Sequence, residues 1–160
     1  MSQLDDHLAQ IPHAAAIGMT LVSRTERGCV VRVPYAQHLV GDPDTGVVHG
    51  GVLTALLDNT CGIAVRPLDV DRSEISIATL DLRIDYMGSA EPHKDIFAEA
   101  VCFKRTKNIA FVRASAYQTS PAEPIATCVA AFMLGTRNEP RDEITGNEPA
   151  GASTTGGVDA

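Results

Sequence analysis

The sequence VVHGGVLTALLDNTCG, at residues 47–62, decides the fold of this chain. Its apolar residues recur at helical spacing and Pro67 follows shortly afterwards, so the sequence predicts one long helix from about Gly50 to Arg66. Residues 36–48, just before it, are rich in turn-forming residues and are predicted to form a loop. No other stretch predicts a helix of this length, and we therefore expect the rest of the chain to pack around it.

Six strands are predicted, two before the helix and four after it. They cover residues 17–25, 28–34, 74–88, 95–105, 109–119 and 124–135. In the last three strands, one face carries mostly small residues, namely Ala98, Ala100, Cys102, Ala110, Val112, Ala114, Ala116, Ala126, Cys128 and Ala130. A sheet face built of alanines lets a bulky element lie close against it, and the long helix is the obvious occupant. The sequence therefore predicts an α+β fold, with an antiparallel sheet around one central helix.

The first strand after the helix shows a regular alternation. From Leu80 to Tyr86, apolar residues at even positions alternate with charged residues at odd positions. This period of two predicts a strand with one buried face and one solvent-facing face.

The two ends of the chain lie outside the predicted core domain of residues 17–136. Residues 1–16 are predicted to form a short amphipathic helix, because Ile11 and two leucines lie at helical spacing, with Pro12 ending it. Residues 137–160 lose all periodicity and are rich in glycine, serine and threonine, so they are predicted to be a disordered tail.

The composition narrows the classes of function. The formal net charge is −7, which argues against nucleic-acid binding. No apolar run approaches ~20 residues, so no transmembrane helix is expected, and the N-terminus lacks the pattern of a secretory signal. The four cysteines are far apart and form no CxxC pair, which favours reduced, buried thiols over a zinc site or disulfides. We expect a cytoplasmic protein without nucleic-acid or membrane partners.

Two glycines, Gly50 and Gly51, open the predicted helix, although glycine costs about 1 kcal/mol relative to alanine in a helix. Backbone N–H groups at a helix N-terminus are unpaired and carry partial positive charge. Bare backbone at this place can polarise a carbonyl group and stabilise an oxyanion. A tight turn into the helix would explain the same two glycines.

Asp58 is the second unusual residue of this stretch. It lies two turns into the helix among leucines, whereas aspartate is a poor helix former and is rarely buried unpaired. The residues that share its helical stripe are small: Gly51, Thr54, Ala55, Cys61 and Gly62. The slot that they leave suits a substrate, with Asp58 as a catalytic group. It equally suits an aspartate held by a cross-helix hydrogen bond.

The run His49-Gly50-Gly51 followed by Asp58 resembles the HGG…D signature of the hotdog-fold thioesterases, in the branch related to phenylacetate-pathway thioesterases. The resemblance extends over roughly residues 15–136 and includes IATLDLRIDYMGSA at residues 77–90. It implies a hydrolase of acyl- or aryl-coenzyme A and a sheet wrapped around the helix. It also implies a homodimer or homotetramer with its sites between subunits, and neither a cofactor nor a metal.

The resemblance also implies roles for single residues. The Gly51 N–H would receive the thioester oxygen, and Gly50 beside it would let the substrate approach. Asp58, from the partner subunit, would activate water or attack the thioester carbon. Thr79 would orient the water, and His49 would hold the start of the helix in place.

Substrate-binding residues are expected in two loops. Asp42 lies nearest to the place where many relatives carry an asparagine, and it is a possible site residue. Coenzyme A carries several phosphate charges, so an acidic chain needs a local basic cluster to bind it. The best cluster is Lys104, Arg105 and Lys107, on a predicted hairpin turn. An ordinary solvated turn would carry the same residues.

Other classes stay open at this point. A hotdog hydratase or dehydratase usually needs a histidine about one turn from the acid, and the residues after Asp58 include none. A non-catalytic acyl-CoA-binding protein would keep the pocket and usually add a DNA-binding segment, for which residues 1–16 are too short and too acidic. A metal site made of His49, Asp58 and Cys61 has no recognised ligand spacing.

Overall fold

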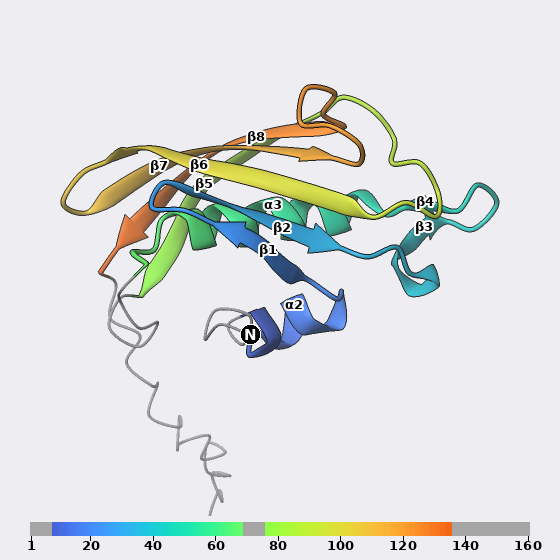
Figure 1. Cartoon of the computed structure of the whole chain (residues 1–160), viewed down its shortest axis with the longest axis horizontal. Helices are drawn as coiled ribbons and strands as arrows, with labels where there is room; N and C mark the ends of the chain where they lie inside the picture. Colours follow the sequence, from blue (N-terminus) through green and yellow to red (C-terminus); the bar gives the residue numbers. More distant parts are fainter. Residues whose placement is uncertain (1–7, 69–75, 136–160) are drawn as a thin grey trace, which may run out of the picture.

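One antiparallel sheet of six strands curves over a single long helix (Figure 1). The computed structural model of the chain describes residues 8–68 and 76–135. The predicted tail at 137–160 and the first residues of the predicted N-terminal helix lie outside these ranges. The strands are β1 (Thr20–Arg24), β2 (Gly28–Val33), β5 (Ile77–Tyr86), β6 (Ile96–Arg105), β7 (Ile109–Tyr117) and β8 (Ala126–Leu134), in the sheet order β1-β2-β6-β7-β8-β5. All six predicted strands are therefore present, each within a few residues of its predicted bounds.

The predicted long helix is confirmed as α3 (Gly50–Ala64). His49 has an extended backbone and caps its first turn, and Val65 ends it two residues before Pro67. The helix lies against the inner face of the sheet, where Leu56 and Leu57 are fully buried. Burial of one such side chain contributes roughly 1.5–3 kcal/mol, so these contacts fix the helix against the sheet.

The inner face of the sheet is lined by small side chains, as the sequence predicts. Those that are almost fully buried are Ala98, Ala100, Ala110, Val112, Ala114, Ala116, Ala126, Cys128 and Ala130. Phe132 is the only aromatic residue buried in the core among the residues described. Because these side chains are short, the backbone of α3 can approach the sheet closely. The expected α+β fold, with a sheet around one helix, is confirmed.

The edge strand β5 contains a β-bulge. Its register with β8 shifts between Thr79 and Asp81, so Leu80 is an extra residue with no partner opposite. The alternation predicted from Leu80 onward is therefore wrong at Leu80, which is 51 % exposed. The bulge changes which side chains share a face. As a result Thr79 and Tyr86 both contact α3, although they are an odd number of positions apart.

The N-terminal segment differs from its prediction. The helix α2 covers Pro12–Ala16, so Pro12 begins a helix instead of ending one. Proline suits the first position of a helix, because its missing N–H would have no intrahelical partner there. Leu8 and Ala14 are buried, so this segment does pack on the core.

The loop before α3 contains a small hairpin that the sequence did not predict. A short 3-10 helix, η1 (Gln37–Leu39), leads into β3 (Val40–Asp42), which pairs with β4 (Val47–Val48). These strands are too short to show an alternating pattern. The hairpin returns the chain to the start of α3, where the His49 N–H donates to the Leu39 carbonyl oxygen at 2.9 Å.

The cysteines are free, as predicted. Cys29, Cys61 and Cys128 are buried and Cys102 is half-buried. Burial raises the pKa of the Cys29 thiol to about 12. In the described part of the chain, no helix is long and apolar enough to cross a membrane.

Candidate active site

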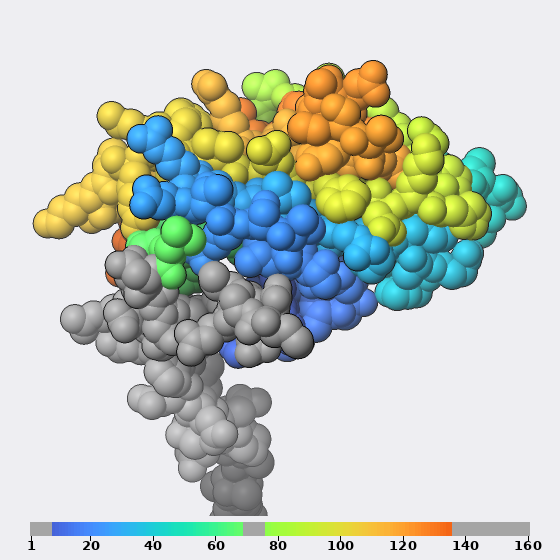
Figure 2. Space-filling model, viewed as in Figure 1, coloured from blue at the N-terminus to red at the C-terminus, as the bar shows by residue number. Residues whose placement is uncertain are grey.

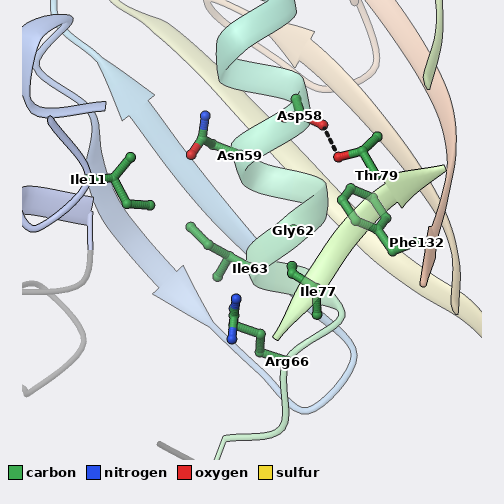
Figure 3. Close-up of a pocket in the computed structure, with 9 residues that line it drawn as sticks. All are labelled: Ile11, Asp58, Asn59, Gly62, Ile63, Arg66, Ile77, Thr79 and Phe132. Carbon is green, nitrogen blue, oxygen red and sulfur yellow. Dashed lines mark hydrogen bonds between the residues drawn. The ribbon is translucent and has the colours of Figure 1, made fainter. Parts of the chain in front are cut away.

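Asp58 and Thr79 meet between α3 and the edge strand β5 (Figure 3). The Thr79 hydroxyl donates a hydrogen bond to Asp58 Oδ1, with 3.0 Å between the two oxygens. Asp58 is half-buried and Thr79 is exposed, so solvent reaches the pair. The hydrogen bond comes from a strand and not from a neighbouring helix. A carboxylate beside a hydroxyl can hold a water molecule between them.

This pair forms part of the wall of a pocket of about 210 Å³ (Figure 3). The other lining residues are Ile11, Asn59, Gly62, Ile63, Arg66, Ile77 and Phe132. Four of the nine lining residues have apolar side chains and four have polar ones, so the pocket offers an apolar surface next to a carboxylate, an amide and a guanidinium.

The first turn of α3 is capped by His49. The Gly51 N–H donates to His49 Nδ1 at 2.9 Å, so the ring carries its proton on Nε2. Neither Gly50 nor Gly51 has a positive φ, so the backbone conformation at these two positions does not require glycine. Close contact explains Gly51 instead, because a Cβ there would lie 2.9 Å from His49 Nδ1. The N–H predicted to receive a carbonyl oxygen is thus the one that His49 occupies.

Gly41 packs against His49 from the small hairpin. A Cβ on Gly41 would lie 2.8 Å from the His49 Cα atom, so the backbone at one of the two residues would have to shift. The glycine therefore lets β3 pass directly behind His49 and fixes it at the start of α3.

Two hydroxyl groups also contact the first turn of α3. Tyr86 Oη donates to the Gly50 carbonyl oxygen at 3.2 Å, and Thr54 Oγ1 lies 3.3 Å from the same oxygen. The two hydroxyl oxygens are 2.6 Å apart. The strand β5 therefore forms hydrogen bonds to the helix through Tyr86 at its first turn and through Thr79 at Asp58.

The two halves of the predicted site are separated within one chain. Gly51 and Asp58 are two helical turns apart, which is about 10 Å along the axis at roughly 1.5 Å per residue. A carbonyl bond is only about 1.2 Å long. A thioester whose oxygen meets the Gly51 N–H therefore cannot present its carbon to Asp58 of the same chain.

Asp42 takes part in its own turn and does not line the pocket of Asp58. Its Oδ2 accepts a hydrogen bond from the Thr45 hydroxyl at 2.6 Å, and its Oδ1 accepts one from the Asp44 N–H at 3.1 Å. The Thr45 hydroxyl, and then the Asp44 N–H, hold the pKa of the Asp42 carboxyl below its usual value. Asp42 is an exposed, ionised residue that closes the turn between β3 and β4.

The basic hairpin between β6 and β7 lies at the opposite end of the molecule from β3 and β4 (Figure 1, Figure 2). Its members have different surroundings. The Arg105 guanidinium donates to the Val65 carbonyl oxygen at 2.9 Å, at the C-terminus of α3. Lys104 and Lys107 are exposed. Of the three predicted coenzyme A ligands, Arg105 therefore has a structural partner within the chain.

Arg24, on β1, binds the chain just beyond the same helix end. Its guanidinium donates to the carbonyl oxygens of Arg66 and Pro67 at 2.8 and 3.1 Å. The last carbonyls of a helix have no intrahelical partners, and cations are favoured there. The two arginines, from β1 and β6, fix the C-terminus of α3.

The thiol of Cys61, next to the pocket residue Gly62 in the sequence, is held protonated. A hydrogen bond with Cys128, followed by burial, raises the pKa of the Cys61 thiol well above its usual range. A thiol that stays protonated is neither a nucleophile nor a metal ligand. Cys61 therefore does not compete with Asp58 for the chemistry.

Sequence reasoning missed Tyr86, Arg66 and Phe132 as neighbours of the site. Arg66 follows Asp58 by eight positions, so helical spacing could have placed it on the pocket side. Tyr86 gave no such signal, because its direction relative to Thr79 depends on the bulge at Leu80.

The chain is similar in sequence and in fold to proteins already known. A sequence profile of the thioesterase superfamily matches residues 45–125. A protein of Pseudomonas aeruginosa, known from its crystal structure, is 45% identical, with a TM-score of 0.70 over 81% of this chain and 94% of that chain.

Two further solved structures are less similar in sequence but share the fold. A thioesterase of Haemophilus influenzae is 16% identical, with a TM-score of 0.72 over 87% of this chain and 92% of that chain. A variant of the phenylacetic acid degradation protein PaaI of Thermus thermophilus is 20% identical, with a TM-score of 0.65 over 76% and 97% of the two chains. The expected hotdog architecture is confirmed.

Proposed function

The chain belongs to the thioesterase superfamily and is a thioesterase, and on this premise we propose that it hydrolyses an acyl- or aryl-coenzyme A to the free acid and coenzyme A. One observation carries the proposal. The hydrogen-bonded pair of Asp58 and Thr79 stands on the wall of a partly apolar pocket, where a carboxylate can meet the carbonyl carbon of a bound acyl group.

Asp58 acts on the thioester carbon through water or directly. As a general base, it takes a proton from water while the water oxygen bonds to the carbonyl carbon. The C–S bond then breaks, and the proton passes to the leaving thiolate. As a nucleophile, it forms an anhydride with the acyl group, expels the thiolate, and is released when water cleaves the anhydride. Thr79 supports both routes, because its hydroxyl orients the carboxylate and can accept a hydrogen bond from water.

The thioester oxygen binds to the Gly51 N–H once the His49 ring has moved aside. This N–H lies in the first turn of α3, where the helix leaves it without an intrahelical partner and the helix dipole favours negative charge. Because Gly51 and Asp58 of one chain are too far apart, Gly51 of the partner subunit completes the site around Asp58.

A homodimer through β5 would provide such a site. The strand β5 is 10 residues long, contains no proline, and pairs with β8 alone among the described strands. A long open edge of this kind invites pairing with another strand. Two β5 strands paired antiparallel about a two-fold axis also set the two α3 helices antiparallel. The first turn of one helix then lies toward the C-terminal half of the other.

The outer face of the sheet supports further assembly to a homotetramer. Val101, Phe103 and Val129 are between 43% and 49% exposed there. Large apolar side chains gathered on one face mark an interaction surface.

Lys104 and Lys107 bind the phosphates of coenzyme A in this proposal. Both are exposed on the hairpin beyond the C-terminal end of α3, which is the end that a partner helix start approaches. The free, buried cysteines accord with a reducing compartment, and we place the reaction in the cytoplasm.

Replacing Asp58 by asparagine tests the function directly. Asparagine keeps the shape and still accepts the Thr79 hydrogen bond, but it neither takes a proton nor attacks a carbonyl. We expect kcat to fall at least ~10²-fold, the usual scale of general base catalysis, with no loss of thermal stability. The measurement is thiol release from a panel of straight-chain acyl-CoAs and aryl-CoAs, phenylacetyl-CoA included.

Glu26→Gln is the matched control, because it removes an exposed carboxylate from the turn between β1 and β2, away from Asp58 and from β5. Its kcat should stay within about twofold of the native value, as expected for a surface substitution. If Asp58→Asn also stays within a few-fold, Asp58 is structural. If the native protein releases thiol from no thioester, it binds acyl-CoA without hydrolysing it.

A further inference from the structure

The peptide group between Gly50 and Gly51 is held at both ends by side chains. At its carbonyl end, Tyr86 Oη and Thr54 Oγ1 lie 3.2 and 3.3 Å from the Gly50 oxygen. At its N–H end, His49 Nδ1 accepts from Gly51 at 2.9 Å. Because a peptide group is planar, the direction of its carbonyl fixes the direction of its N–H. The side chains that hold the Gly50 oxygen therefore aim the Gly51 N–H.

The hydroxyl groups of Tyr86 and Thr54 act as a unit. Their oxygens are 2.6 Å apart, and both lie within hydrogen-bond distance of the Gly50 oxygen. The two hydroxyl groups have one proton each for these three contacts. One hydroxyl can therefore donate its proton to the carbonyl oxygen while it accepts a hydrogen bond from the other hydroxyl. Hydrogen bonds in such a chain strengthen one another by about 10–30% per bond.

Burial within one chain does not explain the position of Tyr86. Its side chain is 54% exposed, and the next residue, Met87, is 62% exposed. The ring lies over Gly50, where an added Cβ would be 3.7 Å from Tyr86 Cε1. A tyrosine left half in solvent contributes little to the core, so its contacts with the first turn of α3 are its main interactions in the described chain.

Tyr86 also belongs to the same strand as Thr79. The bulge at Leu80 lets both side chains contact the helix, one at Asp58 and the other at the first turn. A single edge strand thus holds the proposed catalytic carboxylate and the proposed carbonyl-binding peptide.

We propose that Tyr86 is a positioning residue for the thioester carbonyl. Its hydroxyl, together with that of Thr54, aligns and polarises the Gly50–Gly51 peptide, so that the Gly51 N–H points at the thioester oxygen and binds its developing negative charge more strongly. Tyr86 acts through the backbone and has no contact with the reacting atoms. The inference rests on the proposed thioesterase function of the same site.

Tyr86→Phe tests this role, since it removes the hydroxyl and keeps the ring over Gly50. We expect kcat for the best acyl-CoA of the panel to fall about tenfold, less than the ~10²–10³-fold loss of a whole oxyanion donor, with KM within about twofold. Tyr35→Phe is the matched control, because its hydroxyl also donates to a glycine carbonyl, that of Gly46 at 3.1 Å, away from the site. Its kcat should be unchanged.

Two inhibitors separate positioning from a structural role. A coenzyme A trifluoromethyl ketone, in which the ketone replaces the thioester and adds water or a nucleophile to form an oxyanion, should bind Tyr86→Phe about tenfold more weakly than the native protein. A coenzyme A thioether without the carbonyl should bind both proteins equally. Equal weakening of both inhibitors, or none of either, overturns the inference.

Thr54→Val gives a second, independent variant. It should also lower kcat. Its effect combined with Tyr86→Phe should be smaller than the product of the two separate effects, because both hydroxyls act through one peptide. A fully multiplicative loss would contradict the shared role. Failure of the native protein to hydrolyse any thioester would instead refute the proposed function. The melting temperature of each variant shows whether that variant folds.

Discussion

His49 occupies the site that the substrate is proposed to take. Its Nδ1 accepts from the Gly51 N–H at 2.9 Å, which satisfies a helix-end donor in the free protein. Substrate binding must exchange this hydrogen bond for one to the thioester oxygen. The exchange favours the transition state, because an oxyanion is a stronger acceptor than a neutral imidazole nitrogen.

Another single residue, Asp95, links stability to pH. Its carboxylate accepts from the Tyr35 N–H at 3.0 Å and pairs with Arg32 at 2.6 Å. The Tyr35 N–H, and then Arg32, hold the pKa of Asp95 below its usual value. A group with a lowered folded-state pKa adds stability above its unfolded-state pKa of about 3.9, and this stability is lost as pH falls through the folded-state pKa.

We therefore expect Asp95→Asn to be destabilised by about 1 kcal/mol or less at pH 7, the scale of a partly exposed ion pair. The difference in free energy of unfolding between this variant and the native protein should become smaller as pH falls below about 4. Urea unfolding at pH 7, 4 and 2.5 measures it. Glu91→Gln, which removes the partner of Lys94 at the surface, is the control. A gap for Asp95→Asn that stays constant across this range would show that the carboxylate charge is irrelevant.

At the scale of elements, the β6–β7 hairpin combines two separate tasks. Arg105 caps α3 through the Val65 carbonyl, while Lys104 and Lys107 are exposed. Substituting all three residues would mix a stability effect with a binding effect. The test of coenzyme A binding therefore changes the two lysines and leaves Arg105 in place.

The Lys104→Ala/Lys107→Ala protein should show KM for acyl-CoA raised about tenfold with kcat nearly unchanged. Contacts far from the carbonyl bind ground state and transition state alike, and two screened charge contacts contribute roughly 1 kcal/mol or less each. An N-acetylcysteamine thioester, which lacks the nucleotide, should give the same KM in both proteins. Lys94→Ala is the control. A similar rise in KM for both substrates would indicate a folding defect.

The elements were predictable where a repeating pattern covers many residues. The spacing of apolar residues placed α3, and the alanine-rich faces of the later strands placed the sheet against it. The bulge at Leu80 was not predictable, because pairing with β8 decides it. Pro12 was misread because proline starts a helix as readily as it stops one.

The site was predictable where a residue is out of place locally. Asp58 among leucines and two glycines in one helix turn are anomalies that a single sequence shows. Tyr86 and Arg105 are ordinary at their own positions. Their partners lie 36 and 40 positions away in the chain, so only the folded structure brings them together.

At the scale of the whole molecule, the proposed site requires two chains, and mixed subunits test this. Asp58→Ala removes the carboxylate, and Gly51→Ala crowds the N–H that binds the thioester oxygen. In a dimer with one subunit of each kind, one of the two sites has both groups intact. Random pairing makes half of the dimers mixed, so about a quarter of the native activity should return.

The measurement compares each variant alone with the two co-expressed in equal amounts and purified together through one shared tag, so that all dimers are recovered. Each variant alone should have less than about 1% of the native activity, as expected from the loss of a catalytic base or an oxyanion donor. If the activity of the co-expressed sample is only the sum of the activities of the two variants, both groups act within one chain or in separate steps. Sedimentation of an active monomer at micromolar concentration would lead to the same conclusion.

The bulge at Leu80 has a consequence for comparing this chain with its relatives. Thr79 and Asp81 pair with successive residues of β8, so a chain without a residue at position 80 would keep every side chain of β5 on its present face. Loss of a residue between Asp81 and Asp85, with the strand otherwise regular, would instead turn the side chains between Leu80 and the lost residue to the opposite face. A relative whose strand is one residue shorter should therefore be aligned with its gap at Leu80. An alignment that places the gap elsewhere would match side chains from opposite faces of the sheet.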